Sequence, residues 1–187
     1  MCQAGVRTRT ASRSRTSAYR AALIAILAAV AAWASAAAAK GERWDRTLAE
    51  IREAFPDAPH LTTQQLAEKR SRGEPVLLLD AREAEEFQVS HIDGAVRAAT
   101  VRAALNAIQA DSREPTVVVY CSVGYRSSRL VSWLKARGVK KVFNLEGSLF
   151  QWANEGRPLA RGEQPATRVH PYDDDWGELL NEALRAE

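Results

Sequence analysis

A single cysteine stands where a buried strand gives way to a polar loop. The apolar run TVVVY at residues 116–120 leads directly into Cys121. The loop that follows is made of Ser122, Val123, Gly124, Tyr125 and Arg126. A cysteine on a buried strand is usually an inert apolar residue, whereas a thiol beside an arginine and a helix start can have a lowered pKa and act as a nucleophile. Both interpretations of Cys121 follow from its position.

The number of cysteines makes this thiol more notable. The chain has two, Cys2 and Cys121, and Cys2 lies in a segment that has the features of an export leader. The mature protein would then contain one cysteine, with no partner for an internal disulfide. On this count alone, a reactive thiol and a buried, inert thiol are equally well supported.

The N-terminal segment predicts export. Residues 1–39 hold five arginines and no acidic residue, and residues 21–39 form an apolar run that ends in small side chains. This order is typical of a secretory signal, with cleavage expected after one of the alanines at 36–39. The run is also close to the length that spans a bilayer, so an uncleaved anchor is the alternative. We expect a periplasmic or secreted domain, or one anchored in the inner membrane and facing away from the cytoplasm.

The composition of the chain after residue 39 is typical of a globular, slightly acidic domain. Without the leader the chain has 21 basic and 23 acidic residues, although the whole chain has a net charge of +3. No basic face for nucleic acid is therefore evident. The three histidines are scattered and the mature chain has one cysteine, so no metal-ligand spacing exists and no metal or cofactor is expected.

Strand and helix patterns alternate along the body. Strand-like runs lie at 75–82, 91–99, 116–121 and 140–145, and helical patterns at 43–55, 82–87, 100–110, 127–138 and 147–156. A very short strand and a helix are expected within 60–73, where Thr62 and Gln65 form a capping box and Gly73 is the stop signal. This order predicts an α/β domain with a central, mostly parallel sheet flanked by helices.

Four segments follow from these patterns. They are a signal peptide or signal anchor at 1–39, a helical extension at 40–59, a domain at 60–160, and a linker with a terminal helix at 161–187. Asp173 to Asp175 are expected to cap that helix. Its leucines, Leu179, Leu180 and Leu184, would face inward. Docking of this helix on the domain is the favoured interpretation, and a partner-binding helix is the alternative.

The loop after Cys121 has the composition of an anion-binding turn. In open α/β sheets, ligands bind beyond the carboxyl ends of the strands, where helix N-termini present free N–H groups. With the next helix starting near Ser127, the amides of 122–126 can surround an anion. Gly124 permits an unusual backbone shape and Arg126 adds a permanent positive charge. Together these features would favour the thiolate.

Three stretches of the chain resemble the rhodanese-like domains. They are LLLDAREAEEF, SHIDGAV and the long segment VVVYCSVGYRSSRLVSWLKARGVKKVFNLEGSLFQWANEGRPL, which together cover roughly residues 60–160. The resemblance implies a three-layer α/β fold and a catalytic cysteine, Cys121, that carries sulfane sulfur as a persulfide. It also implies that the 121–126 loop holds the outer sulfur, that the donor is a small sulfur compound such as thiosulfate or a persulfide, and that the acceptor is a thiol or cyanide.

Loop length separates this chain from its relatives with other activities. In the phosphatase and arsenate-reductase branches of this fold the loop has the pattern Cys-x5-Arg. Here Arg126 lies five positions after Cys121, which gives the shorter pattern Cys-x4-Arg and resembles the sulfur-carrying branch. Several thiosulfate-using members have a basic residue directly after the cysteine, and this chain has Ser122, which leaves the preferred donor open. A non-catalytic envelope binding module is the second hypothesis, and a phosphatase or arsenate reductase is the third.

Other polar and aromatic residues have mainly structural expectations. Asp80 and Arg82 lie at the end of a strand and could contact the pocket, but structural hydrogen bonding is favoured. His91, before a turn, is also expected to be structural. Trp133 and Trp152 are predicted to pack at helical positions.

Overall fold

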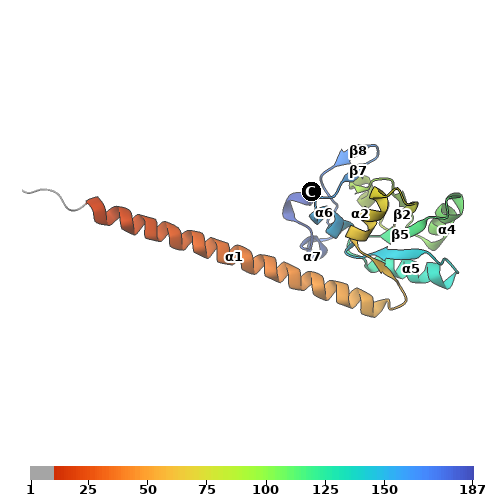
Figure 1. The fold of residues 1–187 in the computed structure, drawn as a ribbon, viewed down its shortest axis with the longest axis horizontal. Helices are drawn as coiled ribbons and strands as arrows, with labels where there is room; N and C mark the ends of the chain where they lie inside the picture. Colours follow the sequence, from red (N-terminus) through yellow and green to blue (C-terminus); the bar gives the residue numbers. More distant parts are fainter. Residues whose placement is uncertain (1–10) are drawn as a thin grey trace, which may run out of the picture. The chain divides into compact units, whose positions relative to one another are not determined.

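The computed structural model describes residues 11–187, so Cys2 and the first arginines of the leader lie outside the described residues. Helix α1 (Ala11–Ala54) continues through both the expected leader and the expected extension, and it ends before Pro56 (Figure 1). Contacts divide the chain into two units, Met1–Glu42 and Arg43–Glu187. Among the described residues, Ala22–Ala54 is the one helical segment long and apolar enough to cross a membrane, a property that secretion signals share.

The second unit is built on a parallel five-stranded sheet, as predicted. Its strands are β1 (His60–Leu61), β2 (Val76–Asp80), β4 (Val96–Arg97), β5 (Thr116–Tyr120) and β6 (Val142–Leu145), in the order β1-β6-β5-β2-β4. All four strand pairs are parallel. Strand β5 is the central strand, so the residue that follows it emerges in the middle of the carboxyl edge.

Helices cover both faces of this sheet. They are α2 (Thr63–Ser71), α3 (Ala84–Val89), α4 (Val101–Ala110), α5 (Tyr125–Ala136) and α6 (Ser148–Asn154). Alternate residues of β5 point to opposite faces. Val118 and Tyr120 pack in one core cluster with residues of α2 and α6, while Val117 and Val119 pack in a second cluster with residues of α4 and α5. The three-layer α/β architecture is therefore confirmed.

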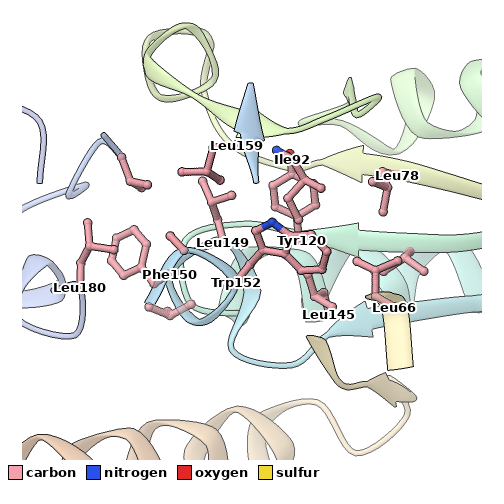
Figure 2. Packing of buried hydrophobic residues seen from close by; sticks show 14 of the residues in the cluster. Leu66, Leu78, Ile92, Tyr120, Leu145, Leu149, Phe150, Trp152, Leu159 and Leu180 are labelled. Atoms are coloured by element: carbon pink, nitrogen blue, oxygen red, sulfur yellow. The ribbon is translucent and has the colours of Figure 1, made fainter. Parts of the chain in front are cut away.

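The first core cluster joins the sheet to the end of α1, to α2, to α6 and to the C-terminal segment. Figure 2 shows Tyr120 of β5 in this cluster together with Leu149, Phe150 and Trp152 of α6. Trp152 is buried, as predicted, and its indole N–H donates to the carbonyl of Pro158 at 2.9 Å. Trp133 is half exposed and lies under the guanidinium of Arg129 at 5.3 Å, so the expectation that it packs inside is wrong.

The C-terminal segment differs from the prediction of a linker and a helix. Residues 159–166 form a hairpin of β7 (Leu159–Arg161) and β8 (Gln164–Ala166), which joins β3 (His91–Ile92) in an antiparallel sheet. Only one short turn of helix follows, α7 (Asp174–Gly177), and a 3-10 turn at Glu182–Leu184. The predicted cap is present, since Asp173 accepts from the Trp176 amide at 2.8 Å. Leu179 and Leu180 are buried, but not on a helix.

The sequence predicts the N-terminus of α2 correctly and the N-terminus of α5 incorrectly. Thr62 and Gln65 form the capping box of α2 as predicted. Helix α5 begins at Tyr125, with Gly124 as its N-cap, rather than near Ser127 with a serine cap. Ser127 and Ser128 are instead buried inside the first turn. The loop after Cys121 is therefore tighter than its sequence indicated.

Candidate active site

Cys121 lies at the carboxyl end of β5, at the base of the turn that leads into α5. The residue is 1% exposed, and its Sγ accepts a hydrogen bond from the Gly124 amide at 3.2 Å. The hydroxyl of Ser127 lies 3.5 Å from the same sulfur. The turn thus brings one backbone donor and one side-chain donor to the thiol.

The N-terminus of α6 fixes the direction in which the turn faces. The amides of Leu149 and Phe150 donate to the carbonyls of Cys121 and Ser122 at 3.1 and 3.0 Å. The Ser148 hydroxyl also accepts from the Cys121 amide at 3.2 Å. In a trans peptide the C=O and the next N–H point in opposite directions. Because α6 holds the two carbonyls, the amides of Ser122 and Val123 are turned away from it.

Gly124 makes the tight turn possible. Its φ is +124°, a conformation that L side chains rarely adopt. A β-carbon there would lie 3.4 Å from both the Asn144 amide nitrogen and the Ile51 side chain. Helix α5 begins at the next residue, so the N–H groups of its first turn have no carbonyl partner within the helix and are directed at the loop.

Opposing effects act on the thiol. Burial raises the pKa of Cys121, but the charge of Arg126 and hydrogen bonds from Ser127 and Gly124 lower it, and the net result is a pKa below the ordinary value. The thiolate is the nucleophilic form of cysteine. The sequence expectation that this loop would favour a thiolate agrees with this geometry.

Arg126 is held by a carboxylate rather than left free. Its two terminal nitrogens donate to the two oxygens of Glu86 at 2.6 and 2.7 Å. Ser122 joins the pair, because its hydroxyl lies 3.1 Å from Glu86 and 3.0 Å from Arg126. Burial raises the pKa of Glu86, but hydrogen bonds and charge from Arg126 bring it below its usual range. Glu86 belongs to the stretch LLLDAREAEEF, and the structure adds it to the site.

A small cavity of about 120 Å³ opens onto the sulfur. Its lining is Cys121, Ser122, Val123, Tyr125, Arg126, Tyr172 and Trp176. Tyr172 and Trp176 come from the C-terminal segment and have no counterpart in the predicted site. The Tyr172 ring lies 4.7 Å from the Arg126 guanidinium. Tyr125 packs edge-on against Phe55, just after α1, at 4.9 Å between ring centres. All but Gly124 of the predicted loop residues line this cavity.

A chain of hydrogen bonds leads from the sulfur away from the cavity. The Ser127 hydroxyl lies 2.6 Å from Oδ1 of Asn144, and Nδ2 of Asn144 lies 3.1 Å from Nδ1 of His60. Burial lowers the pKa of His60, against the opposing charge of Glu146. A hydroxyl has one hydrogen, so Ser127 can donate either to Cys121 or to Asn144. If the oxygen of the Asn144 side chain faces Ser127, the hydroxyl donates to Asn144. If the NH2 group faces Ser127, the hydroxyl is free to donate to Cys121.

Asp80 and Arg82 form a pair of their own behind β2. Both side chains are fully buried, and the guanidinium donates to both oxygens of Asp80 at 2.7 to 3.1 Å and to the Ser90 carbonyl at 2.6 Å. Neither residue lines the cavity. His91 stacks on Phe87 with ring centres 3.9 Å apart. Within residues 11–187, no three His, Cys, Asp or Glu side chains come together as metal ligands.

Fold and site define a three-layer α/β domain with a cysteine on a turn at the carboxyl edge of its sheet. The family model of the rhodanese-like domain matches residues 62–155. The chain belongs to the rhodanese-like family. A thiosulfate sulfurtransferase from Pseudomonas aeruginosa has a similar fold, with a TM-score of 0.54 and 22% identity over 73% of this chain and 26% of that one.

Curated relatives with a different name also match. A tRNA uridine(34) hydroxylase of Escherichia fergusonii is 27% identical over 115 residues, 59% of this chain and 33% of the relative. One from Escherichia coli is 25% identical over 144 residues, 70% of this chain and 41% of the relative. The chain therefore spans less than half the length of these relatives.

Proposed function

We propose that this protein is a sulfurtransferase that carries sulfane sulfur on Cys121. The observation that carries the proposal is the turn itself, which directs the Gly124 amide at Sγ while α6 holds the opposite carbonyls. A negatively charged sulfur at this position, whether the thiolate or the outer atom of a persulfide, would be stabilised by the same donors. A lowered pKa of Cys121 supplies the nucleophile.

The transfer takes place in two displacement steps. The Cys121 thiolate attacks the sulfane sulfur of a donor, whose sulfur–sulfur bond breaks so that the rest of the donor leaves with the electron pair. Cys121 then carries a persulfide. An acceptor thiolate or cyanide attacks the outer sulfur, and the Cys121 thiolate leaves. No general base is needed, because the attacking group is already a thiolate.

Sulfur loading followed by intact mass tests this function. Incubation with a sulfane-sulfur donor is expected to add the mass of one sulfur atom, and cyanide is expected to remove it. The Cys121→Ser variant should take up no sulfur. Absence of added sulfur with every donor, or sulfur that persists in Cys121→Ser, would contradict the proposal and favour a binding module. Turnover of an aryl phosphate that depends on Cys121 would instead favour a phosphatase.

The hydroxylase name of the curated relatives is not carried over to this chain. It belongs to whole proteins of which this chain matches 33% and 41%. Sulfur transfer is the chemistry that the site of this chain supports. Residues outside the match would have to supply any further reaction.

We also propose that the domain works outside the cytoplasm. The support is the apolar helical segment Ala22–Ala54, which suits either a secretion signal or an anchor. Cleavage among residues 36–39 would release a protein to the periplasm. The intact mass and fractionation of the protein expressed in a Gram-negative host would decide, since an unprocessed chain in the cytoplasm contradicts export.

A further inference from the structure

The cavity at Cys121 has one cationic lining residue, and a carboxylate neutralises it. Arg126 is the only Lys, Arg or His that lines the cavity among the residues the structure describes. Its bidentate partner Glu86 has a side chain that is 5% exposed, so water competes little for the pair. The pair contributes no net charge, and ionisation of Cys121 makes the site negative.

Two further groups contact Arg126. The hydroxyl of Ser122 meets one terminal nitrogen, and the ring of Tyr172 lies over the guanidinium. An oxyanion that replaced Glu86 as the bidentate partner of Arg126 would leave a buried carboxylate without its partner. Such a loss is costly. The one lining cation is therefore already neutralised by a carboxylate.

The walls of the cavity suit carbon and sulfur better than an oxyanion. Val123, Tyr125, Tyr172 and Trp176 supply apolar and aromatic surface around the sulfur. The volume of about 120 Å³ equals the liquid volume of about four water molecules. A donor larger than this volume would lie partly outside the cavity.

We propose that the sulfur donor is the hydropersulfide of a small organic thiol, R–S–SH, rather than the thiosulfate dianion. This inference rests on the proposed sulfur transfer and specifies its donor. The Cys121 thiolate attacks the terminal sulfur, the donor's S–S bond breaks, and R–S⁻ leaves with the bonding pair. The proton stays on the transferred sulfur of Cys121–S–SH. Charge balances at one negative unit on each side, and no oxidant or reductant is consumed.

Loading rates from two donors test the inference. Thiosulfate and the hydropersulfide of N-acetylcysteine methyl ester are each mixed with full-length protein that carries Cys2→Ser, so that added sulfur in the intact mass reports on Cys121. The Glu86→Gln variant removes the carboxylate charge, keeps an oxygen for the Glu83 amide, and frees Arg126 for an anion. We expect its ratio of thiosulfate to hydropersulfide rates to rise about tenfold over wild type, because a repelled dianion gains a cation.

A change in the pKa of Cys121 cancels in the ratio of the two loading rates, because both donors react with the same thiolate. Asp111→Asn is the matched control, because it removes a carboxylate from another arginine pair, with Arg113, that does not line this cavity. Its ratio should equal that of wild type. An unchanged or lower ratio in Glu86→Gln overturns the inference.

If Glu86→Gln does not fold, the salt dependence of sulfur loading in the wild-type protein tests the inference. A negative site repels thiosulfate, so added salt should speed loading from thiosulfate more than loading from the hydropersulfide. Salt that slows thiosulfate loading, or wild-type loading that is faster from thiosulfate, would overturn the donor assignment while sulfur transfer stands. Loading from neither donor would overturn sulfur transfer as well.

Discussion

Ser127 and Ser128 are neighbouring buried serines with different relations to the reactive sulfur. The hydroxyl of Ser127 reaches both Cys121 and Asn144. The hydroxyl of Ser128 is buried, and it has no hydrogen-bond partner in the described part of the chain. The pair separates the effect of a donor to the thiolate from the effect of a buried hydroxyl as such.

The Ser127→Ala variant should have a less acidic thiol. Donation to a charged acceptor stabilises it, so loss of the donor should raise the pKa of Cys121 by about one unit. Below both pKa values, iodoacetamide should then alkylate Cys121 about tenfold more slowly, because the rate follows the thiolate fraction. At high pH the two rates should converge. The pH profile of alkylation, read by mass, measures the shift.

The Ser128→Ala variant supplies the control. Removal of an unpartnered buried hydroxyl should leave the alkylation profile of Cys121 in place. A Ser127→Ala profile that superimposes on wild type would mean that the single hydrogen of Ser127 goes to Asn144 in the free protein. In that case the lowered pKa rests on Arg126 and the Gly124 amide.

Among the elements, helix α6 forms backbone hydrogen bonds directly with the turn that carries Cys121. Its N-cap, Gly147, has a φ of +69°, and a β-carbon there would lie 2.5 Å from the Cβ of Gln151. Gly156, just after the same helix, has the same φ of +69° and open space around it. Alanine at the two positions therefore differs in steric contact and not in backbone strain.

We expect Gly156→Ala to lower the free energy of unfolding by about 1–2 kcal/mol, the cost of a left-handed conformation. Gly147→Ala should cost about 1–3 kcal/mol more, because the turn must open to relieve the contact. Such opening would move the amides that hold the carbonyls of Cys121 and Ser122, so sulfur loading should also slow. Urea unfolding and intact-mass loading measure both effects. Equal stability losses for the two variants would contradict the steric argument.

The elements also show what the sequence could predict. Periodicity and buried apolar runs were sufficient for β2, β5 and the helices between them, and the capping residues placed α2 correctly. The start of α5 was placed too late because its cap is the backbone of Gly124, which has no side chain to signal it. The sequence does not predict the hairpin of β7 and β8, because each strand has three residues and the partner strand β3 is remote in sequence.

The candidate site was predicted as far as local sequence allowed. Cys121 and its loop are adjacent in the chain, so strand and loop patterns could place them. Glu86 reaches Arg126 from 40 positions away, and Tyr172 and Trp176 come from the segment for which the sequence predicts a linker and a terminal helix. Their roles depend on tertiary contacts that no short motif records.

At the scale of the whole molecule, the family match and the packed unit have different boundaries. The match begins at residue 62, whereas contacts join residues from Arg43 onward into one unit. Ile51 is 3% exposed in the core cluster that includes Val123 of the reactive turn. Arg43 pairs with Glu178, in the segment that carries Trp176. The last turns of α1 are therefore part of the domain.

Two truncated chains test this boundary. Residues 43–187 should unfold at the same temperature as the full chain and should load sulfur at the same rate, because the removed residues belong to the other unit. Residues 60–187 lose Ile51, whose burial contributes about 1.5–3 kcal/mol, and also lose the partly buried Trp44 and Phe55. Their summed loss is a large part of the 5–15 kcal/mol that is typical of a domain. Thermal unfolding should therefore occur at a clearly lower temperature, and loss of the Phe55–Tyr125 contact should slow loading.

Ile51→Ala in the full chain separates the effect of packing from the effect of chain length. This variant should lower the free energy of unfolding by about 2–5 kcal/mol. If residues 60–187 were as stable and as active as residues 43–187, the end of α1 would not belong to the domain.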